Sequence, residues 1–192
     1  MNAMETARMR LRRFTEADAD DLAALHGDPE VMRYIDDPEP RSVITQEILP
    51  EILQEYGQLP NGMGRFVAEE RESGVFLGWV SLRPASSVGL TGGTELGYRL
   101  RHAVWGHGYA TEGARALVRR GFTELNLDRV VATTMTVNAG SRRVLEKTGL
   151  SLVRTFFVEW PEYLEGAEHG DVEYELTRET WSAQTVPGDR DR

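Results

Sequence analysis

The segment Trp105-Gly106-His107-Gly108-Tyr109-Ala110-Thr111-Glu112 lies between a predicted strand over residues 94–100 and a predicted amphipathic helix over residues 108–125. Its glycines allow positive φ angles and a close approach of the backbone to a ligand. The first N–H groups of the helix have no acceptor within the helix, and they carry the positive end of its dipole. A pyrophosphate placed there would accept several hydrogen bonds, each contributing roughly 1.5–3 kcal/mol. The segment therefore predicts a phosphate-binding turn.

Three kinds of nucleotide site compete for this turn. A Walker loop requires a lysine, and the segment has none. The dinucleotide fingerprint requires a third glycine or alanine where Thr111 stands, and an acidic residue where the next strand is followed by Asn138. Coenzyme A asks only for a glycine-rich helix start that follows a strand. By itself, the motif leaves open coenzyme A and a tight turn that binds no ligand.

The flanking sequence alternates between strand and helix patterns. Helices are predicted from the N-cap Thr15 to the residue before Gly27, over residues 42–56 with a kink at Pro50, and over residues 139–148. The predicted strands cover residues 8–14, 66–68, 75–82, 94–100, 129–137, 152–160 and 172–177. The order β-α-α-β-β-β-α-β-α-β-β indicates an α+β fold with a mixed sheet, in one domain over residues 1–181. We expect residues 182–192 to be a disordered tail.

The composition argues against several classes of protein. The 192 residues carry a net charge of −9, whereas nucleic-acid binding needs a concentrated positive face. No apolar run approaches the ~20 residues of a membrane span, and residues 1–8 lack the apolar core of a signal peptide, so we expect a cytoplasmic protein that binds no membrane. Without cysteine there is no thiolate metal site and no Cys-linked acyl intermediate. The histidines show no metal-ligand spacing, and we expect no metal.

Four segments resemble the GNAT superfamily of N-acetyltransferases. Trp105-x-x-Gly108-x-Ala110 is similar to its acetyl-CoA motif, Gln/Arg-x-x-Gly-x-Gly/Ala. The full run Trp-Gly-x-Gly-Tyr-Ala-Thr-Glu resembles the branch of ribosomal-protein N-terminal (alanine or serine) acetyltransferases. Residues 138–150 resemble the branch pattern Asn-x-x-Ser-x-x-Val-Leu-Glu-Lys-x-Gly-Phe. The other matching segments are residues 28–34 and 174–181, and all four keep the order that this branch shows.

The resemblance implies a single GNAT-like domain, whose twisted and mostly antiparallel sheet is flanked by helices, and acetyl-CoA as the acyl donor. It implies that residues 95–100 form one wall of the donor site and that the turn after them binds the pyrophosphate. His107 stands where Lys or Arg is common in the branch. The residues that we expect to bind the coenzyme are Leu96, Tyr98, Arg101, Trp105, Gly106, His107, Gly108, Tyr109, Ala110, Thr111, Asn138, Ser141 and Arg142.

Direct attack of a primary amine on a thioester, within a ternary complex, needs a base for the amine and a route for the leaving thiolate. Glu95 is the first candidate base and Glu159 the second; a carboxylate that only faces solvent is an equal alternative for Glu95. Ser141 is the candidate acid, beside the alternative of a hydroxyl that serves the local backbone. Many members of the superfamily use a tyrosine on this helix. The helix has no tyrosine here, and Glu146 stands in that part of it.

Acceptor specificity in this superfamily belongs to the first two helices and the last two strands. The acidic residues in those regions suit a cationic amine, either a protein N-terminus or a small molecule, although hydrophilic surface loops would have the same composition. They are Asp36, Asp37, Glu39, Glu159, Glu162, Glu165 and Glu168. A non-catalytic sensor that binds acyl-CoA is the alternative function. The strand residues 156–158 make a homodimer as acceptable as a monomer.

Overall fold

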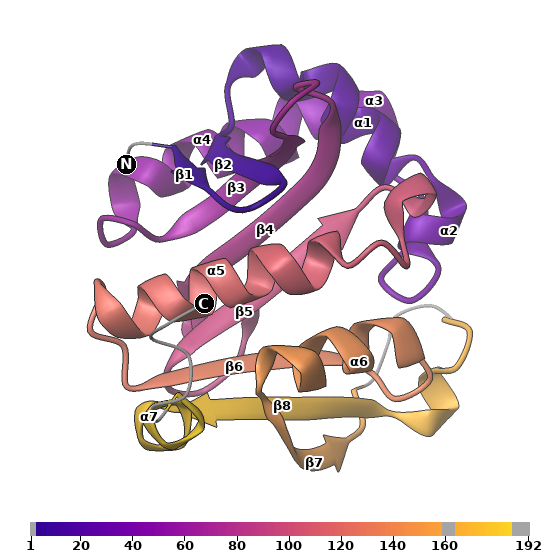
Figure 1. Cartoon of the computed structure of the whole chain (residues 1–192). Helices are drawn as coiled ribbons and strands as arrows, with labels where there is room; N and C mark the ends of the chain where they lie inside the picture. Colours follow the sequence, from indigo (N-terminus) through magenta and orange to yellow (C-terminus); the bar gives the residue numbers. More distant parts are fainter. Residues whose placement is uncertain (1–2, 159–163, 186–192) are drawn as a thin grey trace.

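The computed structural model describes residues 3–158 and 164–185, which form an eight-stranded sheet with helices on both faces (Figure 1). The strand order is β1-β2-β3-β4-β5-β6-β8-β7, and every neighbouring pair is antiparallel except β5 and β6. The strands are β1 (Met4–Glu5), β2 (Met9–Arg13), β3 (Gly64–Glu70), β4 (Phe76–Pro84), β5 (Thr94–Leu100), β6 (Arg129–Met135), β7 (Ser151–Phe156) and β8 (Asp171–Thr177). The helices are α1 (Ala19–His26), α2 (Pro29–Met32), α3 (Arg41–Val43), α4 (Leu49–Gln58), α5 (Tyr109–Thr123), α6 (Ala139–Thr148) and α7 (Arg178–Gln184).

The predicted fold class and the order of the predicted elements are confirmed, and the structure adds three short elements: β1 before the first predicted strand, α2 between the first two predicted helices, and α7 after the last strand. The predicted strand over residues 152–160 is shorter in the structure, since β7 ends at Phe156. Helix α7 includes the first three residues of the expected tail, because Thr177 accepts a hydrogen bond from the backbone of Thr180 and caps a further helical turn. Residues 186–192 lie outside the described residues, so the rest of that expectation stays a prediction.

Each face of the sheet has its own apolar core. Phe66 packs with the residues under α5 and α6, whereas its neighbour Val67 packs with the residues under α1, α2 and α4. Successive side chains of a strand point to opposite faces, which explains why two adjacent residues serve different cores. The sheet therefore separates two layers of helices.

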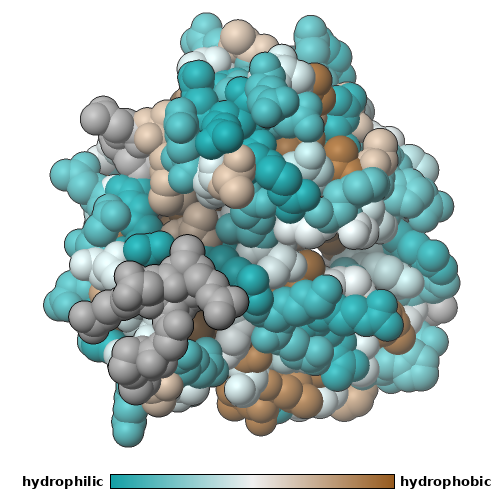
Figure 2. Space-filling model, in the orientation of Figure 1, coloured by the Kyte–Doolittle hydropathy of each residue, from teal (hydrophilic) through white to brown (hydrophobic). Residues whose placement is uncertain are grey.

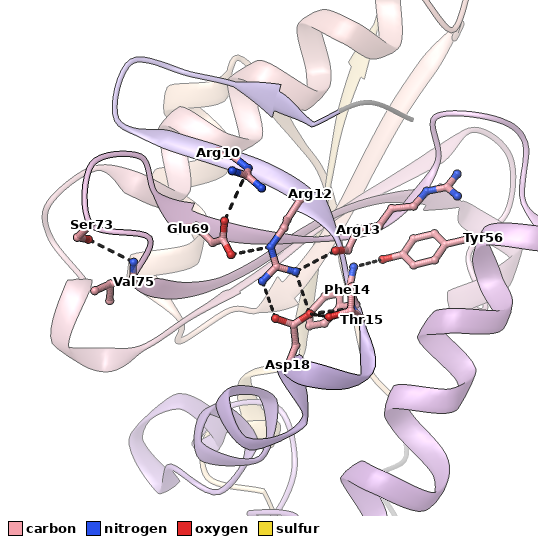
Figure 3. Close-up of polar contacts among 10 residues, drawn as sticks. All are labelled: Arg10, Arg12, Arg13, Phe14, Thr15, Asp18, Tyr56, Glu69, Ser73 and Val75. Atoms are coloured by element: carbon pink, nitrogen blue, oxygen red, sulfur yellow. Dashed lines mark hydrogen bonds and ion pairs between the residues drawn. The ribbon is translucent and has the colours of Figure 1, made fainter.

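The start of α1 is fixed by a network that joins it to the first strands (Figure 3). The Asp18 carboxylate accepts hydrogen bonds from the backbone N–H of Thr15, at 2.7 Å, and from both terminal nitrogens of Arg12, at 2.6 and 2.8 Å. The Nε of Arg12 donates to Glu69 on β3 at 2.6 Å. The predicted N-cap at Thr15 is thus confirmed, and it holds α1 against β2 and β3.

The helix predicted over residues 42–56 spans α3, a π-helical turn over Ile44–Ile48, and α4. Pro50 has no N–H, and in a regular α-helix its ring would clash with the carbonyl of Gln46. The π-helical turn changes the hydrogen-bond register directly before the proline, so the helical run continues. Where the sequence predicted a kink at Pro50, the structure has a π-helical turn directly before the proline.

The sheet opens between β5 and β6. The two strands pair only at Thr94 with Val130 and Glu95 with Val131. On their outer sides, β4 pairs with β5 up to Leu100, and β8 pairs with β6 along its whole length. Helix α5 packs on β5 and α6 packs on β6, and the two helices also contact each other (Figure 1). We call the gap beyond Glu95 the β5–β6 opening.

Strand β7 forms one edge of the sheet and carries exposed apolar side chains. Figure 2 shows hydrophobic surface at the lower edge of the view, where Figure 1 places β7. Exposed side chains in and after this strand are Leu152, Val153, Phe157 and Val158. Within the described residues, no helix combines the length and the apolar character that a membrane crossing requires.

Candidate active site

The β5–β6 opening exposes one edge of β5 to a possible ligand. Leu96 and Leu100 belong to the core under α5, and Tyr98 packs against the same core, so alternate side chains of β5 point to this face. Because β6 stops pairing after Glu95, alternate backbone groups between Leu96 and Leu100 face the opening without a β6 partner. Such groups are the donors and acceptors that an extended amide chain, such as the pantetheine arm of coenzyme A, would need.

The turn that leads into α5 has the geometry of an anion site. Gly106 and Gly108 have φ angles of 79° and 84°, which only glycine adopts readily. The N–H of Glu112 donates to the carbonyl of Gly108 at 3.0 Å, so the N–H groups of Tyr109–Thr111 precede the first helical hydrogen bond and have no acceptor in the helix. A Cβ added at Gly106 would meet no atom within 4 Å. The turn therefore has open space in front of free donors, and it fits a pyrophosphate.

Arg8 holds this turn from a distant part of the chain, and no pattern in the sequence predicted this contact. Its Nη1 donates to the carbonyl of His107 at 2.9 Å, its Nε donates to Glu112 at 2.7 Å, and its guanidinium lies 4.4 Å from the ring centre of Tyr109. Thr6 also donates to Glu112, at 2.6 Å. The sequence shows Glu112 in the first turn of the helix, but its hydrogen-bond partners Thr6 and Arg8 lie more than 100 residues away in the chain. The Arg8 side chain is 45% exposed, which leaves it accessible to a phosphate.

Tyr98 and Ser141 meet across the β5–β6 opening. The Tyr98 hydroxyl lies 2.9 Å from Ser141 Oγ and donates to the Ser141 carbonyl at 3.0 Å. Asn138 caps α6, since its side chain accepts from the N–H of Ser141 at 3.0 Å. Burial raises the pKa of Tyr98 above its ordinary value. The structure thus brings together Tyr98, Asn138 and Ser141, three residues selected from the sequence. The Ser141 hydroxyl contacts the side chain of Tyr98 and does not serve the local backbone alone.

Glu95 lies at the point where β5 and β6 part, on the face covered by α4. Its side chain is 13% exposed, so it is no solvent-facing carboxylate. Its Oε2 lies 3.5 Å from Arg83 on β4, and it has no hydrogen-bond partner among the described residues. Burial raises the pKa of Glu95, a rise that the positive charges of Arg83 and Arg65 oppose. A buried carboxyl with raised proton affinity is suited to remove a proton from an amine. The second candidate, Glu159, lies outside the described residues.

Arg99 is a further charged residue on the face of the sheet covered by α1 and α4, and the sequence analysis did not select it. Its Nη1 lies 3.0 Å from both ring nitrogens of His26, and its guanidinium lies 5.5 Å from the ring centre of Trp79. Burial lowers the pKa of Arg99 to about 10, and burial, helped by Arg99, lowers the pKa of His26 to about 3. The carboxylate of Glu39 lies 4.0 Å from His26. Side-chain alternation along β5 puts Arg99 on the same face as Glu95. The residues that interact with Arg99 come from α1 and from the segment after α2, so the β5 sequence alone does not identify them.

A small hollow of about 160 Å³ lies between the end of α2 and the segment that precedes β8. Tyr34 and Val137 form part of its wall, and Glu165, Glu168 and His169 supply its polar groups. Arg33 donates two hydrogen bonds to Glu165, at 2.8 and 3.1 Å, and so joins α2 to that segment. Two of the predicted acidic residues therefore share one hollow. Glu162 lies outside the described residues.

Arg101 and Arg142 have protein partners. The Arg101 backbone N–H donates to Leu77 at 2.9 Å, and its side chain lines a cavity of about 350 Å³ together with Asp28 and residues of α1. Arg142 donates to the Tyr174 hydroxyl and to the Thr136 carbonyl, both at 3.1 Å. Their expected contacts with the coenzyme stay predictions. Trp105 directs its indole N–H to the Leu100 carbonyl at 2.8 Å, and thus holds the turn against the end of β5.

Comparisons with known proteins agree with this geometry. The sequence model of the acetyltransferase (GNAT) domain family matches residues 8–151. The FsC-acetyl coenzyme A-N(2)-transacetylase of Aspergillus fumigatus is 35% identical over 195 residues, which cover 96% of this chain and 80% of that protein.

Solved structures share the fold at lower identity. The ribosomal-protein-S5-alanine acetyltransferase from Vibrio fischeri superposes with a TM-score of 0.73 at 17% identity, over 94% of this chain and 99% of that one. The spermidine N-acetyltransferase from Vibrio cholerae, in complex with CoA and spermine, superposes with a TM-score of 0.69 at 18% identity, over 92% of this chain and 99% of that one. These two likenesses concern the arrangement of the backbone.

Proposed function

The chain belongs to the acetyltransferase (GNAT) family and is an acetyl-CoA-dependent N-acetyltransferase, and from this premise we propose that it acetylates a small cationic amine by direct attack in a ternary complex. The observation that carries the proposal is the pairing of the Gly106–Gly108 turn with the open edge of β5. The turn offers free helix N–H groups to a pyrophosphate, and the strand edge offers backbone groups to an amide chain. Acetyl-CoA bound there supplies the acetyl thioester.

The residues of the chain would divide the chemistry among them. Glu95 takes the proton of the acceptor ammonium, directly or through a water molecule. Backbone N–H groups of β5 beyond Glu95 polarise the carbonyl that the amine attacks. As the N–C bond forms, the C–S bond breaks, and the sulfur leaves as a thiolate or takes a proton from Ser141. The Tyr98 hydroxyl, 2.9 Å from Ser141 Oγ, orients that serine.

Two observations favour a small amine as the acceptor. The hollow at Tyr34, Glu165 and Glu168 holds two carboxylates, of which Glu165 is already paired with Arg33, and its volume of about 160 Å³ suits a single cationic side chain or polyamine end. The transacetylase from Aspergillus fumigatus, with 35% identity, is named for transfer to N(2) of FsC. A protein N-terminus is the second candidate, because the chain also shares its fold with a ribosomal-protein-alanine acetyltransferase.

Thermal unfolding with and without acetyl-CoA tests the donor without a guess about the acceptor. A ligand at a hundred times its dissociation constant adds about 2.7 kcal/mol to the free energy of unfolding. We expect a clear rise in Tm with acetyl-CoA and none with ATP or NAD. No rise with acetyl-CoA would remove the proposed donor site.

Release of free CoA then tests catalysis and the acceptor class. The acceptors to compare are spermidine, an amino acid amide and a short peptide with a free N-terminus. We expect faster release with the small amines than with the peptide, and a preference for the peptide would contradict the proposed class. Binding of acetyl-CoA without release for any amine would instead support the sensor.

A further inference from the structure

Five charged side chains form a continuous chain from the surface of α4 to Glu95. Glu51, which is 63% exposed, lies 2.9 Å from Arg65, and Arg65 lies 3.1 Å from Glu55. Glu55 lies 3.3 Å from Nη1 of Arg83, and Nη2 of the same Arg83 lies 3.5 Å from Glu95. Helix α4 and strands β3, β4 and β5 each contribute to this chain. The two glutamates at its inner end, Glu55 and Glu95, are both largely buried.

The charges of this cluster do not balance. Three carboxylates share the two guanidinium groups of Arg65 and Arg83. Glu55 contacts both arginines, and Glu51 is solvated and contacts one of them. Among the described residues, Glu95 forms an ion pair only with Arg83, and this N–O distance of 3.5 Å is the longest of the four in the cluster. Its Oε2 also lacks a hydrogen-bond partner among those residues. The under-neutralised carboxylate is therefore Glu95.

Among the described residues, Arg83 is the one cation in an ion pair with Glu95, and Arg65 acts on it from a greater distance. Its register partner on β6 is Val131, and its register partner on β4 is Arg83 itself. A Cβ added at Gly97 would lie 2.8 Å from Glu95 Oε1 and 2.6 Å from Ser81 Oγ, so the carboxylate lies over this glycine and near the serine. Burial raises the pKa of Glu95; Arg83 and Arg65 oppose the rise, and the negative charge of Glu55 adds to it.

We propose that Glu55 is a positioning residue for Glu95: by binding Arg83 from the opposite side, it prevents Arg83 from neutralising Glu95 in a tight ion pair. The consequence of this sharing is a carboxylate that still accepts a proton. Glu55 forms ion pairs with Arg65 and Arg83, and it acts on Glu95 through Arg83 and through its own negative charge. The inference rests on the base role proposed above for Glu95, but its effect on the Glu95 carboxyl can be measured separately.

The direct test is a pH titration of the Glu95 side-chain carboxyl by ¹³C NMR, with the signal assigned from Glu95→Gln. In Glu55→Gln, Arg83 is free to pair with Glu95, and we expect the proton affinity of Glu95 to fall at least about tenfold, one pKa unit. Glu51→Gln is the matched control, because Glu51 contacts Arg65 and not Arg83. We expect it to change that affinity by less than about twofold. An unchanged titration in Glu55→Gln, or an equal fall in Glu51→Gln, would overturn the inference.

A second variant, Glu55→Asp, keeps the proposal testable if Glu55→Gln does not fold. Glu55→Asp keeps the charge but withdraws it from Arg83 by one methylene, so we expect a smaller fall of the same sign. The pH profile of kcat/KM then separates the two proposals. A shift of its acid limb to lower pH in Glu55→Gln supports both. An NMR shift without a shift of the limb upholds the role of Glu55 and overturns the base role of Glu95.

Discussion

The phenolic oxygen of Tyr98 lies 2.9 Å from the hydroxyl oxygen of Ser141, and this contact joins β5 to α6 across the β5–β6 opening. Both residues flank the space that we assign to the donor. Ser141 is held from its other side by the Asn138 cap of α6. A serine hydroxyl is a weak acid, so its orientation by a second hydroxyl matters for any proton that it delivers.

Replacing Tyr98 by Phe removes this hydrogen bond and preserves the apolar packing of the ring. We expect kcat to fall by about 10- to 100-fold, at or below the lower end of the range for proton-transfer groups because Tyr98 only orients Ser141, while the dissociation constant of acetyl-CoA changes by less than about threefold. Steady-state kinetics and calorimetric titration measure the two quantities. If the two hydroxyls act as a unit, the double variant with Ser141→Ala will lose no more activity than Ser141→Ala alone. Additive losses would contradict that coupling.

Replacing Glu95 by Gln removes the proposed base with little change in shape. We expect kcat/KM to fall by about 10²- to 10⁴-fold at neutral pH, with acetyl-CoA affinity near that of the parent protein. Because burial raises the pKa of Glu95, the parent enzyme should lose activity as the pH falls through a value above the ordinary 4.5 for glutamate. Glu95→Gln should lack that limb. Equal losses of turnover and of coenzyme affinity would indicate a structural role.

Replacing Gly108 by Val tests the phosphate-binding turn. Its φ of 84° is unfavourable for a β-branched residue, and an added Cβ would lie 3.5 Å from Nη2 of Arg8, which holds the turn. The loss of two charge-assisted hydrogen bonds should weaken acetyl-CoA binding at least about 100-fold. Gly74→Val is the control, since Gly74 has a φ of 73° and open space around it in the β3–β4 hairpin. Similar losses of affinity in both variants would mean that backbone strain, not the turn, is responsible.

Replacing Arg8 by Met tests whether the N-terminal hairpin supports the coenzyme turn. The change removes the hydrogen bonds to His107 and Glu112, and we expect acetyl-CoA to bind about tenfold more weakly. Arg10→Met is the control, because Arg10 is also exposed and lies two residues further on, in β2. Its ion pair among the described residues is with Glu69, at 3.8 Å. Calorimetric titration of both variants gives the comparison. Equal affinities in the two would show that Arg8 has no part in the turn.

Replacing His26 by Gln should reduce the pH dependence of stability. Burial, together with Arg99 and Arg65, lowers the pKa of His26 to about 3, so the unfolded chain binds this proton more readily than the folded chain. The stability is fully present above the ordinary pKa of 6.5 and is lost as the pH falls towards 3. At pH 5 the loss amounts to about 2 kcal/mol. Urea unfolding at pH 7 and pH 5 should show this difference in the parent protein and in His169→Gln, whose histidine is exposed. An unchanged difference in His26→Gln would contradict the assignment.

Local sequence patterns were sufficient for most of the fold. The N-cap at Thr15, the turn at Gly108 and the cap at Asn138 are contacts within three or four residues, so the residue types at those places specify them directly. The alternation along β5 assigned Leu96 and Glu95 to opposite faces for the same reason. The sequence analysis did not predict the short strand β1, because a two-residue strand carries no periodic pattern. It also did not predict the last helix, α7.

The sequence by itself determined the turn between β5 and α5, the order of the elements and the likeness to a family of transferases. Only the tertiary structure decided which distant groups meet: Arg8 with the carbonyl of His107, 99 residues apart, Tyr98 with Ser141, 43 apart, and Glu55 with Arg83, 28 apart. Hydrogen-bonding and charged groups have no periodic signal that identifies distant partners. Their protonation depends on burial and on neighbouring charges, which exist only once the sheet and its two helical layers have assembled.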